Sequence, residues 1–145
     1  MTIYVDATAL VCSFLDRPDA PSWRAWVRES KPQLVTSAQI MTQMRAELAG
    51  ESWLLRQDAF EYLAEIEVLR ISDQALKLAA FAQGVLTPFE ALSIGIARAD
   101  ERISGIATYE LRTAAVAHLH GLAVVSPGRG ALWWEPGTTL GLRGR

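Results

Sequence analysis

Cysteine is almost absent from this sequence, since Cys12 is the single cysteine among 145 residues. An intrachain disulfide is therefore impossible, and a metal site built from several thiolates of one chain is excluded. Cys12 lies in an apolar stretch, so we expect it to be a small buried residue.

Neither sign of charge is in large excess. The 14 basic and 16 acidic residues leave a formal net charge of -2, which excludes a strongly basic protein that coats duplex nucleic acid without regard to sequence. With 50% hydrophobic and 21% charged residues, the chain is too apolar to be disordered. Its length fits one compact globular domain.

Long hydrophobic runs are also lacking. The apolar stretch near the N-terminus, residues 7–15, is too short to cross a bilayer. Asp6 precedes it and Arg17 is the first basic residue, whereas a secretory signal begins with basic residues. We therefore expect no membrane span and a cytoplasmic protein.

Short β-rich runs alternate with helical patterns along the chain. The predicted strands are residues 3–5, 34–35, 68–71, 103–107 and 122–125. The predicted helices cover residues 7–15 and 21–30, a segment capped by Thr36 or Ser37, a segment from Ser52, a segment from Ser72 or Asp73 to Gly84, a segment from Thr87, and residues 109–120. Such alternation predicts an α/β fold with right-handed crossovers and a mainly parallel sheet of about five strands, covered by helices on both faces.

The chain changes character near residue 129. We expect one domain over residues 1–128, followed by a C-terminal tail over 129–145 that is rich in Gly and Arg. Trp133 and Trp134 indicate that part of this tail packs back on the domain or meets a partner.

Three acids lie where a parallel sheet binds ligands, which is at the carboxyl ends of its strands. Asp6 ends the first strand, Glu110 follows the fourth, and Glu90 lies in the first turn of the helix before it. If the first and fourth strands are neighbours, the three carboxylates meet in one cleft. Oxygen ligands without His or Cys suit Mg²⁺ or Mn²⁺ rather than Zn²⁺.

Each acid also has a purely structural explanation. Thr87 and Glu90 have the spacing of a capping box. Glu110 is favoured near a helix N-terminus by the helix dipole, and Asp6 can cap the helix that follows it. An α/β binding protein in which these acids are only helix caps is therefore one open alternative.

Four segments together resemble a PIN domain, and more narrowly the VapC toxins of type II toxin-antitoxin systems. They are IYVDATAL (residues 3–10), LVTS (34–37), ATYELR (107–112) and GLAVVSPG (121–128). The resemblance covers residues 1–128 and implies an α/β/α sandwich. It also implies an Mg²⁺- or Mn²⁺-dependent endoribonuclease, a cognate antitoxin that blocks its site, and a homodimer.

The resemblance assigns the family's four acidic positions to Asp6, Gln43, Glu90 and Glu110. Only Asp6 is the residue usual in the family, because Gln43 replaces a Glu and the other two replace Asp. We expect Asp6, Glu90 and Glu110 to be metal ligands, with Gln43 completing the site. A Glu places its carboxylate roughly 1.5 Å farther out than an Asp, and a misplacement of about 1 Å can lower a rate on the order of 10²-fold.

Further residues are expected to support this divergent site. The resemblance gives Thr8 and Thr108 supporting positions, and Ser93 replaces a common His. Glu47, four residues after Gln43, shares its helix face and can supply the missing carboxylate, or it is a solvated surface charge.

Arginine makes up most of the 14 basic residues and can hold phosphate through two hydrogen bonds or stack on bases. Arg45 and Arg112 are the predicted RNA contacts. The leading hypothesis is a metal-dependent endoribonuclease that hydrolyses RNA phosphodiesters with weakened activity. The alternative within the family is a catalytically inactive PIN module that binds RNA or an antitoxin.

Overall fold

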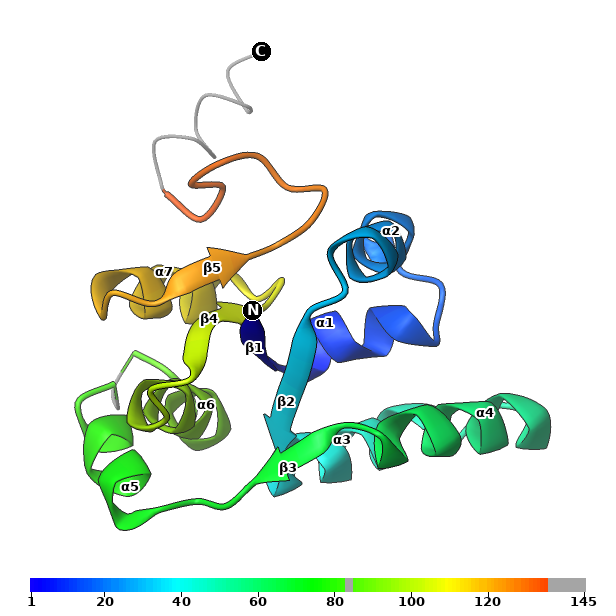
Figure 1. The fold of residues 1–145 in the computed structure, drawn as a ribbon, viewed down its shortest axis with the longest axis horizontal. Helices are drawn as coiled ribbons and strands as arrows, with labels where there is room; N and C mark the ends of the chain where they lie inside the picture. Colours follow the sequence, from blue (N-terminus) through cyan, green and yellow to red (C-terminus); the bar gives the residue numbers. More distant parts are fainter. Residues whose placement is uncertain (83–84, 136–145) are drawn as a thin grey trace.

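The computed structural model describes residues 1–82 and 85–135. One sheet of five parallel strands, in the order β3-β2-β1-β4-β5, runs through the molecule (Figure 1). Its strands are β1 (Thr2–Val5), β2 (Gln33–Ser37), β3 (Glu67–Leu69), β4 (Ile103–Ala107) and β5 (Ala123–Val125). The predicted parallel α/β fold is confirmed, although the third strand begins and ends slightly earlier than expected.

Helices cover both faces of this sheet, as the alternating sequence pattern predicts. They are α1 (Ala7–Leu10) with the 3-10 turn η1 (Val11–Ser13), α2 (Ala20–Ser30), α3 (Ala38–Leu48), α4 (Trp53–Ala64), α5 (Asp73–Ala80), α6 (Pro88–Ala99) and α7 (Leu111–Leu119). Figure 1 shows α1 to α4 on one side of the sheet and α5 to α7 on the other. None of the helices described in residues 1–82 and 85–135 is long and apolar enough to cross a membrane.

The predicted helix over residues 7–15 is wrong beyond Leu10, where the chain tightens into η1. The guanidinium of Arg24 on α2 donates to the carbonyls of Cys12, at 2.9 Å, and Leu15, at 3.1 Å. Trp23 Nε1 donates to Ser13 Oγ at 2.9 Å. These side chains of α2 satisfy backbone and hydroxyl groups at the end of the turn, which favours an early stop.

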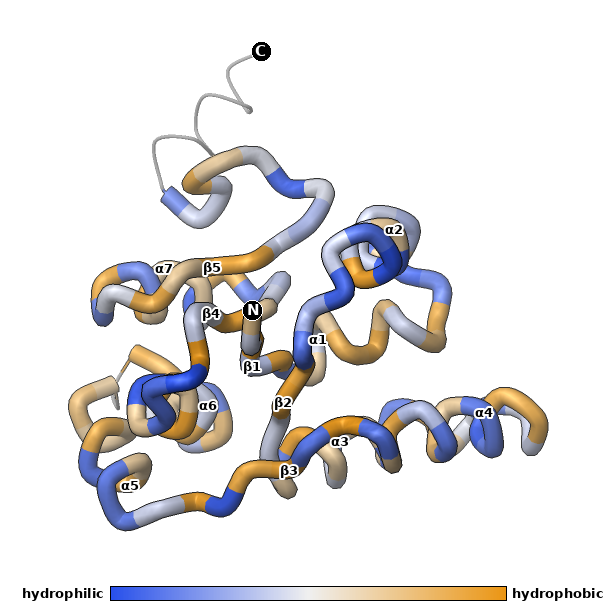
Figure 2. Tube along the Cα trace, in the orientation of Figure 1, coloured by the Kyte–Doolittle hydropathy of each residue, from blue (hydrophilic) through white to orange (hydrophobic). Residues whose placement is uncertain are grey.

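The central strand is buried on both faces. Ile3, Tyr4 and Val5 are each at most 1% exposed, as expected for a strand that lies in the middle of a parallel sheet between two helical layers. Figure 2 shows hydrophobic residues concentrated along the strands. The chain order reverses between β1 and β4, and ligands bind at such a switch point in open α/β sheets.

Close helix packing beside this switch point depends on Gly95 of α6. A Cβ on Gly95 would lie 2.2 Å from the carbonyl oxygen of Ala75 on α5. Only glycine lets the two helices approach this closely. Helix α5 ends at Ala80, and the predicted stop at Gly84 lies outside the described residues.

The first residues of the tail pack against the domain. Arg129 binds Asp19 through Nε, 2.9 Å from Oδ1, and through a terminal nitrogen, 2.8 Å from Oδ2. The same guanidinium lies 4.9 Å from the centre of the Trp133 ring. Trp134 is buried, with its ring centroid 5.5 Å from that of His118. Residues 136–145 of the predicted tail lie outside the described residues.

Candidate active site

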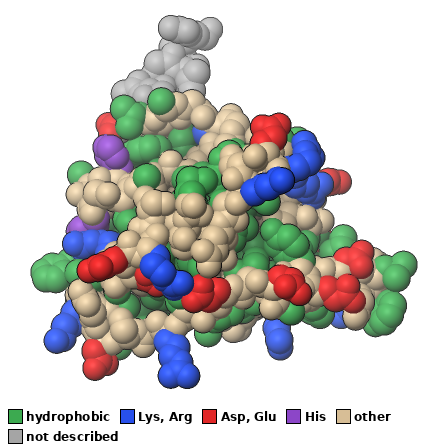
Figure 3. All heavy atoms as spheres, in the orientation of Figure 1, with side chains coloured by type: hydrophobic (Ala, Val, Ile, Leu, Met, Phe, Trp, Pro, Cys, Tyr) green, Lys and Arg blue, Asp and Glu red, His purple; other side chains and the backbone are tan. Residues whose placement is uncertain are grey.

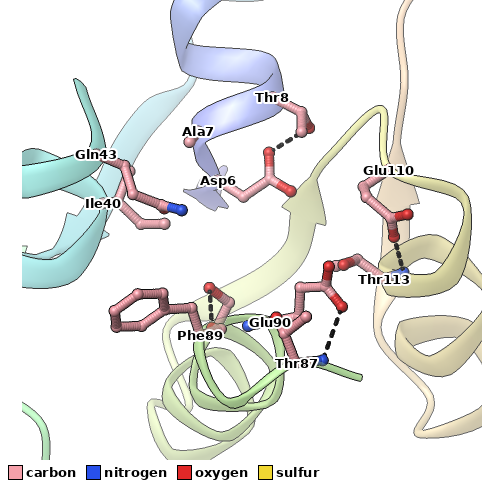
Figure 4. A pocket seen from close by; sticks show the side chains of 11 residues that line it. Asp6, Ala7, Thr8, Ile40, Gln43, Thr87, Phe89, Glu90, Glu110 and Thr113 are labelled. Atoms are coloured by element: carbon pink, nitrogen blue, oxygen red, sulfur yellow. Dashed lines mark hydrogen bonds between the residues drawn. The ribbon is translucent and has the colours of Figure 1, made fainter. Parts of the chain in front are cut away.

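A cavity of about 140 Å³ opens at the carboxyl ends of β1 and β4 (Figure 4). It brings together the four predicted catalytic residues, although they come from four different parts of the chain. Its lining residues are Asp6, Ala7, Thr8, Ile40, Gln43, Thr87, Phe89, Glu90, Ser93, Glu110 and Thr113. This cavity, called the acidic pocket below, depends on the pairing of β1 with β4, which the sequence left open.

Asp6 is the most buried acid of the pocket, with 7% of its surface exposed. Its Oδ1 accepts hydrogen bonds from the Thr8 hydroxyl at 2.6 Å and the Ala9 N–H at 3.1 Å. Its Oδ2 accepts one from the Thr108 hydroxyl at 2.5 Å. Burial raises the pKa of Asp6 to about 6, against the opposing effect of these hydrogen bonds. Thr8 and Thr108, two of the predicted supporting residues, thus both contact Asp6 directly.

The same two threonines connect Asp6 to the start of α7. Thr8 Oγ1 accepts from the Tyr109 N–H at 2.8 Å, and Thr108 Oγ1 accepts from the Glu110 N–H at 3.1 Å. One hydrogen-bonded network therefore fixes the end of β1 relative to the loop after β4. The backbone of Glu110 is placed by the same groups that orient the carboxylate of Asp6.

All three acids of the pocket also cap helices. Asp6 caps α1 through Ala9, and Glu110 caps α7 by accepting from the Thr113 N–H at 2.7 Å. Glu90 Oε2 accepts from the Thr87 N–H at 3.1 Å and completes a capping box. The structural explanation for each acid is correct, yet the acids still line one cavity. Capping and a functional role do not exclude each other here.

Gln43 lines the acidic pocket from α3, whereas Glu47 does not. Glu47 lines an adjacent cavity of about 450 Å³ and lies 3.6 Å from a guanidinium nitrogen of Arg17. Both side chains of this ion pair are about half exposed, so the pair contributes little to stability. The carboxylate of Glu47 is thus placed beside Gln43 but faces Arg17.

Beneath the pocket lies a buried hydroxyl cluster that sequence reasoning did not foresee. Tyr4 shares hydrogen bonds with Ser37, at 2.7 Å, and with Ser93, at 3.2 Å. Burial raises the pKa of Tyr4 to about 12. Ser37 was predicted as a possible cap of α3, but its side chain makes no capping hydrogen bond because it faces Tyr4. Ser93 forms part of the wall of the pocket and connects it to this cluster.

The predicted RNA contacts lie outside the pocket. Arg45 and Arg112 are exposed and line neither the acidic pocket nor the adjacent cavity. Arg17 and Arg129 line the adjacent cavity instead. Sequence reasoning missed both, since Arg17 lies in a turn that indicated only a helix end and Arg129 lies in the tail. Thr113 was missed as well, although its spacing of three residues from Glu110 is a capping signal.

Comparison with known proteins places the chain in a family. No protein-family model matches it. Ribonuclease VapC46 from Mycobacterium tuberculosis is 30% identical over 132 residues, which cover 86% of this chain and 97% of the relative. The chain belongs to the VapC family of PIN-domain proteins.

Two solved structures share the fold of this chain. A toxin-antitoxin complex from Klebsiella pneumoniae matches 88% of this chain and 99% of its own, with a TM-score of 0.68 and 18% identity. FitAcB from Neisseria gonorrhoeae matches 88% and 98%, with a TM-score of 0.66 and 14% identity. At these identities the likeness shows a shared fold.

The VapC resemblance implies a metal ion, and the pocket meets this requirement only in part. Its carboxylate oxygens are the ligands that Mg²⁺ and Mn²⁺ prefer. However, no three His, Cys, Asp or Glu side chains within residues 1–82 and 85–135 are placed to hold one metal ion. Glu90 and Glu110 are turned toward the backbone N–H groups of their helices. The side chains as arranged therefore do not form a metal site.

The charge of this VapC-family pocket restricts what it can bind. Among its lining residues in the described part of the chain there are three carboxylates and no Lys, Arg or His. Carboxylates and the Gln43 amide can orient water, and a carboxylate can accept its proton. Cleavage of a phosphodiester also requires positive charge near the phosphate oxygens, which the lining does not supply.

Proposed function

We propose that this chain is the ribonuclease toxin component of a toxin-antitoxin pair and hydrolyses RNA phosphodiesters in the acidic pocket. The observation that carries the proposal is the convergence of Asp6, Gln43, Glu90 and Glu110 on one cavity at the switch point of the sheet. A relative named as a ribonuclease, which aligns over almost its full length, supports the same activity.

We propose Mg²⁺ or Mn²⁺ as the cofactor. Support comes from the oxygen ligands of the pocket and from its lack of lining cations, since a divalent ion would supply the missing positive charge. Asp6, Glu90 and Glu110 are the proposed ligands, and Glu90 and Glu110 would have to leave their helix N-termini to reach the ion. An ion that binds only the folded chain raises its melting temperature, so thermal unfolding with Mn²⁺ and with EDTA tests this part separately.

The proposed activity is weaker than that of an enzyme with a complete set of four acids. Gln43 offers a neutral amide where a carboxylate would add charge, and no acid takes its place among the described residues that line the pocket. Loss of one carboxylate ligand weakens the binding of a hard cation such as Mg²⁺. The substitution Gln43→Glu is therefore expected to increase the rate.

An antitoxin protein and a second copy of this chain are the proposed partners. Support for the antitoxin comes from the structural neighbour described as a toxin-antitoxin complex, and the homodimer follows from the family resemblance. Light scattering of the purified chain, alone and with the product of an adjacent reading frame, tests both proposals.

The direct test of the proposed function is cleavage of a structured RNA pool by the purified native chain, with Mg²⁺ and then with Mn²⁺. Asp6→Asn should abolish cleavage, and Gln43→Glu should increase it. Cleavage that persists unchanged in Asp6→Asn would assign the activity to another site or to a contaminant.

A second candidate function is a catalytically inactive module that binds RNA or an antitoxin. The neutral Gln43 and the absence of a three-acid metal group among the described residues favour it. It predicts no cleavage by the native chain at any Mn²⁺ concentration, with retained binding of the partner.

A further inference from the structure

Thr113 is a polar residue of the acidic pocket without a hydrogen-bond partner for its hydroxyl. The residue is 1% exposed and lies near the start of α7. Its Oγ1 is buried and has no hydrogen-bond partner among the described residues. Thr113 lines the pocket, and in Figure 4 its side chain extends from α7 into it.

A buried hydroxyl without a partner destabilises a folded protein, and native structures rarely keep one. Valine has nearly the same shape and would fill the same space without this cost. The unpaired hydroxyl of Thr113 thus points to a partner that enters the pocket from outside. The backbone N–H of Thr113, in contrast, is paired, because it donates a hydrogen bond to Glu110 Oε2 at 2.7 Å.

The chemistry of the pocket restricts this partner. The residues Thr113, Glu90 and Glu110 all line this one cavity, so a group held near the Thr113 hydroxyl lies close to carboxylates. An anionic phosphate oxygen would need the proposed divalent ion beside it, because carboxylates line the pocket and Lys, Arg and His are absent from its described lining. A neutral hydroxyl fits, since it can accept a hydrogen bond from Thr113 and donate one to a carboxylate.

In RNA, the neutral hydroxyl with this dual capacity is the ribose 2′-OH, which also distinguishes RNA from DNA. We infer that Thr113 donates a hydrogen bond to the 2′-hydroxyl oxygen of the nucleotide held in the acidic pocket and thereby selects RNA over DNA. The same 2′-hydroxyl donates a hydrogen bond to a neighbouring carboxylate oxygen. This inference rests on the proposed ribonuclease function and assigns the residue that recognises the sugar.

The experiment combines sugar substitutions in the substrate with substitutions of Thr113. The cleavage site of the native chain is first mapped in a short RNA. A series of the same RNA then carries one 2′-deoxynucleotide at each position around that site, and kcat/KM is measured for each. The variants are Thr113→Val, which removes the hydroxyl, and Thr113→Ser, which keeps it. Thr42→Val, at an exposed position on α3 outside the pocket, is the matched control.

One 2′-deoxy position should lower kcat/KM about tenfold for the native chain, the factor that corresponds to about 1.4 kcal/mol. The same penalty is expected for Thr113→Ser and Thr42→Val. Thr113→Val should cleave the all-RNA substrate about tenfold more slowly and show no further penalty for the 2′-deoxy substitution. Its melting temperature should equal or exceed that of the native chain, because an unpaired buried hydroxyl has been removed.

Three results would overturn the inference. The first is a 2′-deoxy penalty in Thr113→Val as large as in the native chain, and the second is the absence of any sensitive position in the native chain. The third is a clearly lower melting temperature of Thr113→Val, which would show that the hydroxyl has a structural partner. Each leaves the proposed ribonuclease function intact, whereas failure of the native chain to cleave RNA overturns both proposals together.

Discussion

At the scale of single residues, Asp6 combines deep burial with a charge. Desolvation raises the pKa of its carboxyl from 3.8 to about 6 in the folded chain. The folded state therefore holds this proton more tightly than the unfolded state. Ionisation of Asp6 lowers the free energy of unfolding as pH rises from about 4 to about 6, and the full loss is present at pH 7. The carboxylate is kept at a cost in stability, as is common at functional sites.

Asp6→Asn should therefore stabilise the folded chain at neutral pH, in buffer that contains EDTA. The amide carries no charge and keeps the shape of the side chain. Its oxygen can still accept from Thr8 and Ala9, and its NH2 group, which cannot accept from the Thr108 hydroxyl, can donate to Thr108 Oγ1 instead. We expect the free energy of unfolding in urea to rise by about 2 kcal/mol at pH 7 and the gain to shrink toward pH 5. Asp58→Asn, at an exposed position on α4, is the control. Equal or lower stability of Asp6→Asn at pH 7 would contradict this account.

Residue positions differ in how far the sequence predicts them. Asp6, Glu90 and Glu110 are identifiable because each lies at a strand end or in the first turn of a helix. The positions of Thr113, Arg17 and Arg129 depend on rotamers and on contacts between distant segments. No periodic pattern encodes such contacts. The prediction of Arg45 and Arg112 as RNA contacts rests on their nearness in sequence to site residues, and neither residue lines the pocket.

At the scale of helices and strands, two acids of the pocket begin helices as well as line a cavity. Glu90 belongs to the capping box of α6, and Glu110 is the N-cap of α7. A substitution at either position therefore changes helix stability and pocket charge together unless the replacement preserves the cap. This double role explains why helix signals alone could not separate a functional site from a structural one.

Two substitutions of Glu90 separate these effects. Glu90→Ala removes the capping box and should lower the free energy of unfolding by about 1 kcal/mol. Glu90→Gln keeps the box, since glutamine is accepted at this position, and should unfold within a few tenths of a kcal/mol of the native chain, roughly the scatter of such measurements. Chemical unfolding of both variants, with the exposed Glu101→Ala as the control, measures the difference. Equal losses for Ala and Gln would show that the charge, and not the cap, stabilises α6.

Element boundaries were predictable where local signals decide them. Ser52, Ser72 and Thr87 cap their helices as their positions indicate. The prediction of one helix over residues 7–15 was wrong because Arg24, from a different helix, donates hydrogen bonds to the carbonyls of Cys12 and Leu15. That contact is tertiary, and the local pattern of residues 7–15 contains no sign of it.

At the scale of the whole molecule, charges are dispersed and apolar side chains remain on the surface. Acidic and basic side chains both occur across the face shown in Figure 3, in accord with the near-zero net charge. Trp53 and Leu54 at the start of α4 are 67% and 69% exposed. Helix α4 buries Ala59 and Leu63 instead. Single exposed apolar side chains are normal on protein surfaces, and only large contiguous apolar patches mark surfaces that meet other proteins.

Arg129 forms one attachment of the described part of the tail to the domain. Its guanidinium joins Asp19 beside α2 to the ring of Trp133. Arg129→Ala should lower the free energy of unfolding by about 1 kcal/mol, the combined effect of a partly exposed ion pair and a cation–π contact. It should also expose Trp133, which a red shift of tryptophan fluorescence in the folded chain would report. Arg45→Ala serves as the control, and an unchanged spectrum of Arg129→Ala would show that other contacts hold the tail.

The most direct measurement for the central claim is RNA cleavage by a double variant, Glu90→Gln with Glu110→Asn. Both replacements preserve helix caps, because glutamine suits a capping box and asparagine suits an N-cap. The double variant should therefore melt like the native chain but cleave RNA at least about 100-fold more slowly, since the pocket has lost two carboxylates. Cleavage at the native rate by this folded variant would show that the acids only cap helices and that the acidic pocket is not the active site.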